Sequence, residues 1–119
     1  MKIGRKLTGG RYLFSRKKKM YEKPGQRRIT KLGEDKRKSK KVMGGRRKTF
    51  LLKVKTINLQ DNGKIIKAEI KNVLETPSNR FFARQNILTR GTIIETTKGK
   101  AKITNRPTQE GIVNGILIK

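Results

Sequence analysis

The sequence contains no cysteine, no histidine and no tryptophan. Without cysteine there is no disulfide framework and no thiolate zinc site. The usual proton shuttle near neutral pH, histidine, is missing, and so is the cysteine nucleophile. Only 8 of 119 residues are acidic, and the adjacent pair Glu34-Asp35 lies among lysines, where charge balance or the start of a helical turn explains it. We therefore predict that the chain is not an enzyme and holds no metal or cofactor.

Long hydrophobic runs are also missing. The longest apolar runs are two to three residues, such as Ile116-Leu117-Ile118, far short of the roughly 20 that span a bilayer. No apolar signal segment follows the basic start, and the basic residues lack the apolar stripe of a membrane-surface helix. We expect a cytosolic protein with no membrane partner.

Positive charge, in contrast, is abundant. The chain has 33 Lys and Arg and a formal net charge of +25. Such a charge repels itself in a compact state, and it favours a polyanionic partner because each neutralised phosphate releases a counterion. A merely soluble, highly charged surface is the alternative, although small domains usually carry a net charge of only about 2–8. We expect a nucleic acid as partner.

The charge divides the chain into two parts. Residues 1–48 hold 20 Lys and Arg against 3 acids, and residues 49–119 hold 13 against 5. The first part has only 12 apolar residues and the second has 26. Twelve apolar side chains cannot offset the cost of ordering 48 residues. We predict a basic RNA-binding arm over residues 1–48, disordered when free, and a folded core over residues 49–119.

Alternation of apolar and polar residues predicts strands in the core. Residues 49–58 place Phe50, Leu52 and Val54 on one face, and residues 64–76 place Ile66, Ala68, Ile70 and Leu74 on one face. The turn residues 61–63 (Asp-Asn-Gly) would join these two strands in a hairpin. Two further strands are expected at residues 92–97 and 101–105, and the apolar residues 112–118 form a strand that is central or seals a barrel, since an exposed edge of this kind would aggregate.

These strands predict a mainly β fold. Five or six short strands separated by turns are typical of a small antiparallel β-barrel or sandwich. A core of about 71 residues is small enough to be marginally stable, so bound nucleic acid would stabilise it.

Two glycine pairs stand beside arginine, in Gly9-Gly10-Arg11 and Gly44-Gly45-Arg46. Neither continues into a phosphate-binding loop for nucleotides, so no small-molecule substrate is expected. Glycine allows close backbone approach to phosphate, and arginine can fork onto phosphate oxygens or a guanine edge. A plain flexible hinge is the alternative reading.

Aromatic residues lie among cations at Tyr12, Phe14 and Tyr21, and again at Phe81 and Phe82 between Arg80 and Arg84. Rings in such surroundings can stack on unpaired bases. They can equally hold the arm against the core or against a neighbouring protein, and both readings stay open for the arm. For the second cluster we expect one ring to cap the barrel while the arginines face RNA.

Several segments together resemble the archaeal and eukaryotic family of ribosomal protein eight of the small subunit. The resemblance lies in residues 6–11, 16–22 and 44–48 and, most specifically, in residues 77–80 and 84–91, in the order of the family and over nearly the whole chain. It implies a β-barrel with basic extensions, bound as a structural component to small-subunit ribosomal RNA beside neighbouring ribosomal proteins in the cytoplasm. Arg46 departs from the Asn expected after the second glycine pair. The length is more typical of archaeal members.

The main hypothesis is thus a non-catalytic ribosomal protein whose arm neutralises phosphates and whose core makes a second contact. A free RNA chaperone or RNA-binding regulator is the alternative. A DNA-compacting protein and an RNA-modifying enzyme are remoter. The residues predicted to bind RNA are Lys2, Arg5, Lys6, Thr8, Gly9, Gly10, Arg11, Arg16, Lys17, Lys18, Lys19, Arg27, Arg28, Lys31, Arg37, Lys38, Gly44, Gly45, Arg46, Arg47, Lys48, Asn79, Arg80, Arg84 and Asn86.

Overall fold

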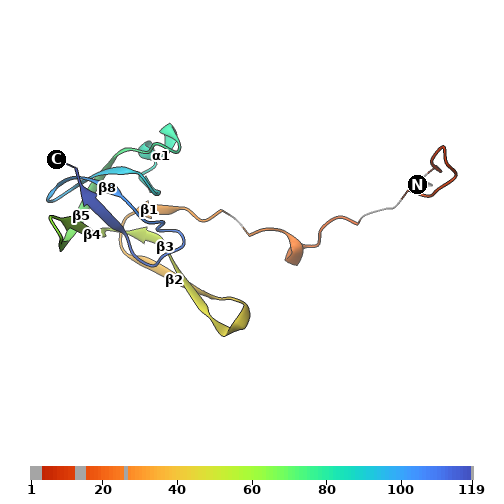
Figure 1. Ribbon diagram of the computed structural model, residues 1–119, viewed down its shortest axis with the longest axis horizontal. Helices are drawn as coiled ribbons and strands as arrows, with labels where there is room; N and C mark the ends of the chain where they lie inside the picture. The colour runs from red at the N-terminus through yellow and green to blue at the C-terminus, as the bar shows by residue number, and fades with distance from the viewer. Residues whose placement is uncertain (1–3, 13–15, 26, 119) are drawn as a thin grey trace.

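The computed structural model describes residues 4–12, 16–25 and 27–118. A β-rich body lies at one end and an extended N-terminal segment leads away from it, giving dimensions of 71 × 36 × 25 Å (Figure 1). The extended segment contains one short 3₁₀ turn, η1 (Met20–Glu22). The mainly β fold predicted from the sequence is confirmed.

Five strands form a closed barrel in the order β4-β5-β7-β8-β9. Four of the five pairings are antiparallel, and the pair that closes the barrel, β4 with β9, is parallel. The apolar C-terminal strand therefore seals the barrel, as predicted. The strands are β4 (Thr56–Asp61), β5 (Lys64–Glu75), β7 (Ile93–Thr96), β8 (Gly99–Ile103) and β9 (Asn114–Leu117).

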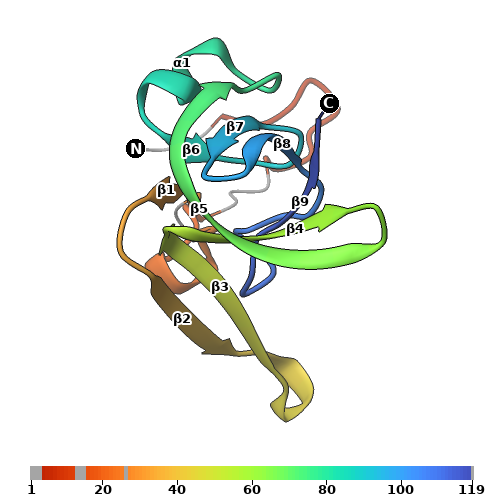
Figure 2. The same ribbon diagram turned by 90° about the vertical axis from the view of Figure 1, so that its left-hand side faces the viewer.

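A second sheet adjoins the barrel in the order β2-β3-β1-β6. Its distal part is a two-stranded ribbon that projects away from the barrel (Figure 2). The strands are β1 (Thr30–Leu32), β2 (Lys36–Lys41), β3 (Arg47–Val54) and β6 (Ile87–Leu88), and the turn between β2 and β3 contains η2 (Met43–Gly45).

The predicted turn at residues 61–63 forms as expected. Asn62 and Gly63 have φ of 46° and 82°, and Asp61 pairs with Lys64 across the hairpin. Positive φ at two successive residues is the geometry that Asn-Gly favours, and its twist matches that of the flanking strands. The hairpin joins β4 to β5, however, so the single strand predicted over residues 49–58 is wrong. The chain breaks it at Lys55, and residues 47–54 pair in the other sheet.

Two predicted burial patterns also need correction. In β3, Leu51 is fully buried as well as Phe50, so both faces of the strand are covered at this point, and Leu51 belongs to the hydrophobic core. In β5, register irregularities at Lys71 and Leu74 turn Val73 inward and leave Leu74 exposed. A β-bulge inserts a residue and reverses the alternation beyond it, which a strict period of two cannot anticipate.

The sheet begins inside the segment that the charge division assigned to the arm. Thr30 is buried, and its hydroxyl donates a hydrogen bond of 2.9 Å to the carbonyl oxygen of Leu51. Lys31 and Leu32 pair with Lys53 and Val54. Residues 31–32 and 36–41 of the segment assigned to the arm therefore pair with β3. Whether this part needs RNA to become ordered stays a prediction.

Candidate nucleic-acid interface

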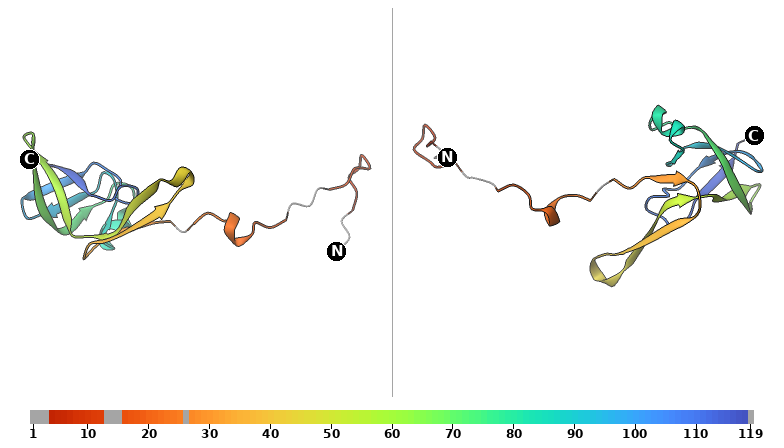
Figure 3. Two further views of the ribbon diagram at one scale, coloured as in Figure 1. Left: turned by 90° about the horizontal axis from the view of Figure 1, so that it is seen from below. Right: turned by 180° about the vertical axis from the view of Figure 1, so that it is seen from behind.

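Residues 36–49 form the projecting structure that we call the basic ribbon (Figure 3). All six residues of β2 are exposed, and five of them are Lys or Arg. Register places Lys40 opposite Lys48 and Lys41 opposite Arg47, and Lys36 faces Lys53 at the root. Like charges directly opposite each other destabilise a strand pair. The ribbon thus concentrates positive charge at a cost to its own stability, which an anionic partner would relieve.

The second glycine pair lies at the tip of this ribbon. Gly44 and Gly45 have φ of 77° and 75°, a region that favours glycine, and the amide of Val42 donates to the carbonyl oxygen of Arg46 at 2.8 Å. The glycines therefore allow the chain to reverse, and they leave Arg46 and Arg47 exposed beside the turn.

The first glycine pair lies at a similar turn in the extended segment. Arg5 and Arg11 form an isolated bridge, the amide of Lys6 donates to Gly10 at 2.9 Å, and Gly9 has φ of 78°. The ammonium of Lys6 lies 5.7 Å from the ring centroid of Tyr12. Both Gly-Gly motifs are therefore turns with cations on both sides rather than hinges in a straight chain.

Arg16 is engaged within the arm. Its guanidinium makes two hydrogen bonds to the carboxylate of Glu22, at 2.6 and 2.9 Å, and the backbone amide of Lys19 donates to the same carboxylate at 3.1 Å. These bonds, that from Arg16 first, lower the pKa of Glu22. The neighbouring Lys17, Lys18 and Lys19 are exposed. In the free chain, then, Arg16 is partly neutralised, whereas a phosphate could compete with Glu22 for it.

Two predicted RNA contacts pack against aromatic rings where the arm meets the core. The guanidinium of Arg28 lies 3.8 Å from the ring centroid of Phe50, and that of Arg27 lies 6.0 Å from the centroid of Phe82. Phe82 is half-buried, whereas Phe81 is 65% exposed. Both contacts lie directly before β1, and the closer one, of Arg28 with Phe50, joins the arm to β3 through a cation–π interaction.

The predicted second contact surrounds the short helix α1 (Arg80–Arg84). The side chain of Asn79 accepts a hydrogen bond of 2.9 Å from the amide of Phe81 and caps the helix, and Asn86 takes a φ of 51° just after it. Arg80 and Arg84, four residues apart, are exposed on the helix. Both asparagines thus shape the segment that presents the arginines, and their contact with RNA stays a prediction.

A hollow beside this helix holds a feature that sequence reasoning missed. Thr76 is buried, and its hydroxyl is the one buried side-chain polar atom without a hydrogen-bond partner among the described residues. Arg80 lines the same hollow. No pattern in the sequence marks Thr76, because its burial follows from the irregular end of β5.

The structure brings many of the predicted residues together in three groups, the turn at residues 5–11, the basic ribbon and the region of α1. Outside these groups, Arg16, Lys17, Lys18 and Lys19 lie in the extended segment, and Arg27 and Arg28 lie where that segment meets the core. Lys31 lies exposed on β1, and Lys2 lies outside the described residues, as does the aromatic Phe14. The sequence prediction missed the ribbon cations Lys36, Lys40 and Lys41, although the run of charge over residues 36–41 was a usable signal.

Among the residues described, no group of three or more acidic or other potential metal ligands comes together. Within that same part of the chain, no helix is both long and apolar enough to cross a membrane.

Comparison with known proteins identifies relatives along nearly the whole chain. The model of the family described as ribosomal protein S8e matches residues 1–118. Proteins named small ribosomal subunit protein eS8 are 45% identical in Nanoarchaeum equitans, 41% in Methanosarcina barkeri and 40% in Haloarcula marismortui. Each match covers 97% of this chain and 92–94% of the relative.

Proposed function

The chain belongs to the ribosomal protein S8e family, and on that premise we propose that it is a structural constituent of the small ribosomal subunit that binds ribosomal RNA. The observation that carries the proposal is the match over 97% of the chain to three archaeal proteins of that name. The protein is not an enzyme. Its partners are small-subunit ribosomal RNA and neighbouring ribosomal proteins, in the ribosomes of the cytoplasm.

The distribution of charge supports separate RNA contacts by different parts of the chain. The basic ribbon projects from the barrel with cations on both faces, and the turn at residues 5–11 repeats that arrangement at the far end of the arm. Phosphates would neutralise both, with the salt dependence that counterion release imposes. Arg80 and Arg84 offer a separate contact on the opposite side of the second sheet from the ribbon tip (Figure 2). RNA contact by the whole predicted set, and the ordering of residues 1–48 on RNA, are part of this proposal.

Sedimentation of ribosomes tests the proposal. An epitope-tagged chain, expressed in its own cells, is expected to co-sediment with small subunits in a sucrose gradient and to remain there after a high-salt wash. A protein found mainly free would favour the RNA chaperone or regulator instead, and a protein found on DNA would overturn RNA binding altogether.

A further inference from the structure

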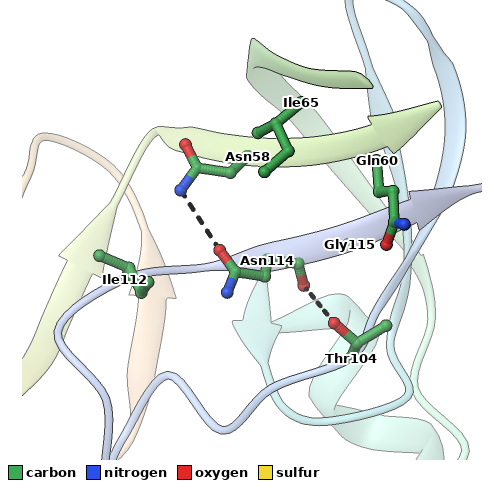
Figure 4. A pocket seen from close by; sticks show the side chains of 7 residues that line it. All are labelled: Asn58, Gln60, Ile65, Thr104, Ile112, Asn114 and Gly115. Atoms are coloured by element: carbon green, nitrogen blue, oxygen red, sulfur yellow. Dashed lines mark hydrogen bonds between the residues drawn. The ribbon is translucent and has the colours of Figure 1, made fainter. Parts of the chain in front are cut away.

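One hollow on the barrel surface has an uncharged lining, unlike the basic surfaces described above. It has a volume of about 380 Å³ and lies over β4 and β9 (Figure 4). None of its lining residues is charged, in a chain with a net charge of +25. Pockets that hold small groups in proteins commonly measure about 300–1,000 Å³ and combine apolar walls with a few placed polar groups. The lining consists of Asn58, Gln60, Ile65, Thr104, Ile112, Asn114 and Gly115.

Two side-chain amides form the centre of the hollow and hold each other in place. Nδ2 of Asn58 donates to Oδ1 of Asn114 at 3.2 Å (Figure 4). The backbone of Asn114 is fixed as well, because its amide donates to the side-chain oxygen of Asn105 at 3.0 Å and its carbonyl oxygen accepts from the hydroxyl of Thr104. Within the described part of the chain, Oδ1 of Asn58 and Nδ2 of Asn114 have no further partner. The pair therefore leaves one acceptor, Oδ1 of Asn58, and one donor, Nδ2 of Asn114, which point away from each other at its two ends (Figure 4).

Apolar side chains stand on either side of this amide pair. Ile65 is 77% exposed and Ile112 is 43% exposed, and the two lie at different edges of the hollow in the close view (Figure 4). A flat group that enters the hollow could contact both isoleucines with its faces while its edge meets the amides. A nucleobase, which is planar and carries both donors and acceptors, has this chemistry.

A second hollow, which is lined by charged residues, adjoins the first. The second hollow measures about 400 Å³, shares Asn58 and Ile112 with the first, and contains Arg37 and Lys67. Arg37 belongs to the root of the basic ribbon, and Lys67 is the register partner of Asn58. Asp35 also lines it, but its carboxylate accepts from the amide of Lys55 at 2.8 Å and from the hydroxyl of Thr56 at 3.3 Å. An uncharged site therefore adjoins a cationic one that is continuous with the ribbon.

We propose that the two adjoining hollows together bind one unpaired nucleotide of RNA, with its base against the Asn58–Asn114 amide pair and its phosphate beside Arg37 and Lys67. The proposal rests on the RNA-binding function and adds a base-reading site to a surface otherwise suited to phosphates. The position of the second hollow at the root of the basic ribbon favours RNA as the partner. A protein partner would gain only apolar contacts with the exposed isoleucines.

Nuclear magnetic resonance of the full chain tests the site directly. The protein is titrated with the tetranucleotides rA4, rC4, rG4 and rU4, and the side-chain amide signals of Asn58 and Asn114 are followed. One of the four is expected to shift these signals and to bind about fivefold to a hundredfold more tightly than the weakest, as a paired donor and acceptor discriminate between bases. Signals that stay unmoved, or that move alike with all four, overturn the site.

Variants separate this site from RNA binding as such. Replacing Asn58→Ala together with Asn114→Ala is expected to abolish the preference among tetranucleotides while the salt dependence of binding to small-subunit ribosomal RNA stays unchanged. Gln109→Ala, which removes an exposed amide outside both hollows, is the matched control and keeps the preference. If the unaltered chain does not bind ribosomal RNA at all, the proposed function is contradicted. If it binds ribosomal RNA but shows no preference among the tetranucleotides, only the nucleotide site is contradicted.

Cross-linking in the particle distinguishes RNA from protein as the occupant. The chain lacks cysteine, so Ile112→Cys carrying a benzophenone label is unique, and Ile118→Cys is a control of equal exposure (42% against 43%) outside the hollow. In assembled small subunits the label at residue 112 is expected to join to RNA more than the label at residue 118. A cross-link from residue 112 to a ribosomal protein alone would refute the nucleotide site.

Discussion

The two hairpins of this protein, β4–β5 and β2–β3, are built from the same kind of strand pairing and are stabilised differently. The β4–β5 hairpin buries Ile57, Leu59 and Ala68 in the barrel. The distal part of β2–β3 buries nothing, because all six residues of β2 and the first three of β3 are exposed. A two-stranded ribbon without a buried face is at best marginally stable in water.

The difference teaches that regular backbone structure does not reveal what stabilises a segment. The barrel hairpin follows from its own apolar side chains, whereas the ribbon depends on its root, where Phe50 and Leu51 are buried, and on a partner that neutralises its cations. Removing charge from the ribbon should therefore stabilise the free ribbon, and removing apolar contacts should destabilise only the barrel and the root.

The largest expected effect comes from truncation. Removing residues 1–26 leaves every strand and both arginine–ring contacts in place, so cooperative unfolding in urea should persist while RNA affinity falls. Removing residues 1–48 deletes β1 and β2 and uncovers Phe50 and Leu51, at a cost of about 5 kcal/mol or more, comparable to the whole stability of a small domain. The division of charge along the chain predicts that this shorter core stays folded. Circular dichroism during urea unfolding decides between the two expectations.

The next largest effect comes from removing apolar contacts, and it distinguishes the packed barrel from the ribbon. Ile94 is fully buried, and Ile94→Ala should lower the free energy of unfolding by about 2–5 kcal/mol through lost burial and a residual cavity. The control Ile116→Ala removes the same atoms from a half-exposed position on β9 and should cost far less. Urea midpoints of the two variants provide the comparison, and equal losses would mean that the barrel interior is not the main source of stability.

Part of this contrast was predictable from the sequence. Asn62-Gly63 specifies its turn by the positive φ that both residues tolerate, and the alternation in residues 93–103 marks a local hairpin. The pairing of β1 and of β2 with β3 was not predictable. Residues 36–41 carry no apolar pattern, and β1 pairs with β3 in parallel. In both cases the deciding contacts come from strands elsewhere in the sheet.

The candidate interface was predictable in its charge but not in its geometry. Runs of Lys and Arg announce where phosphates bind, yet no pattern indicated that Arg28 would stack on Phe50 or that Asn58 would meet Asn114, 56 residues away. Charge acts at long range, so a basic surface can be predicted even when the positions of its side chains are not known accurately. A hydrogen-bonded pair such as Asn58 and Asn114 exists only once the barrel has closed.

A smaller effect comes from removing positive charge, and it distinguishes the ribbon from the barrel. Replacing Lys40→Gln together with Lys41→Gln removes two like-charge pairs, each of which destabilises the ribbon by roughly 0.2–1 kcal/mol. Hydrogen exchange of ribbon amides in the free protein should therefore slow. Binding to ribosomal RNA should weaken, with the slope of log K against log salt reduced by about 1.4–1.8 if each lysine contacts one phosphate.

The control for that variant changes the same charge on the barrel. Lys64 and Lys71 are exposed on β5, and Lys64→Gln with Lys71→Gln should leave the exchange of ribbon amides unchanged and reduce the salt slope less. If both double variants reduced the slope equally, net charge rather than the ribbon would govern RNA binding.

The smallest expected effect concerns the ion pair within the arm. Because Arg16, followed by the Lys19 amide, lowers the pKa of Glu22, the pairing is complete above the ordinary carboxylate pKa and is lost as pH falls through the lowered value. Acidification of the free protein should thus release the turn η1 while the barrel stays folded, which the Glu22 side-chain signals can report. If Arg16 exchanges Glu22 for a phosphate on RNA, Glu22→Gln should raise RNA affinity by no more than about fivefold, since exposed ion pairs are weak. Unchanged or weaker binding by Glu22→Gln would mean that Arg16 serves the local turn rather than the RNA.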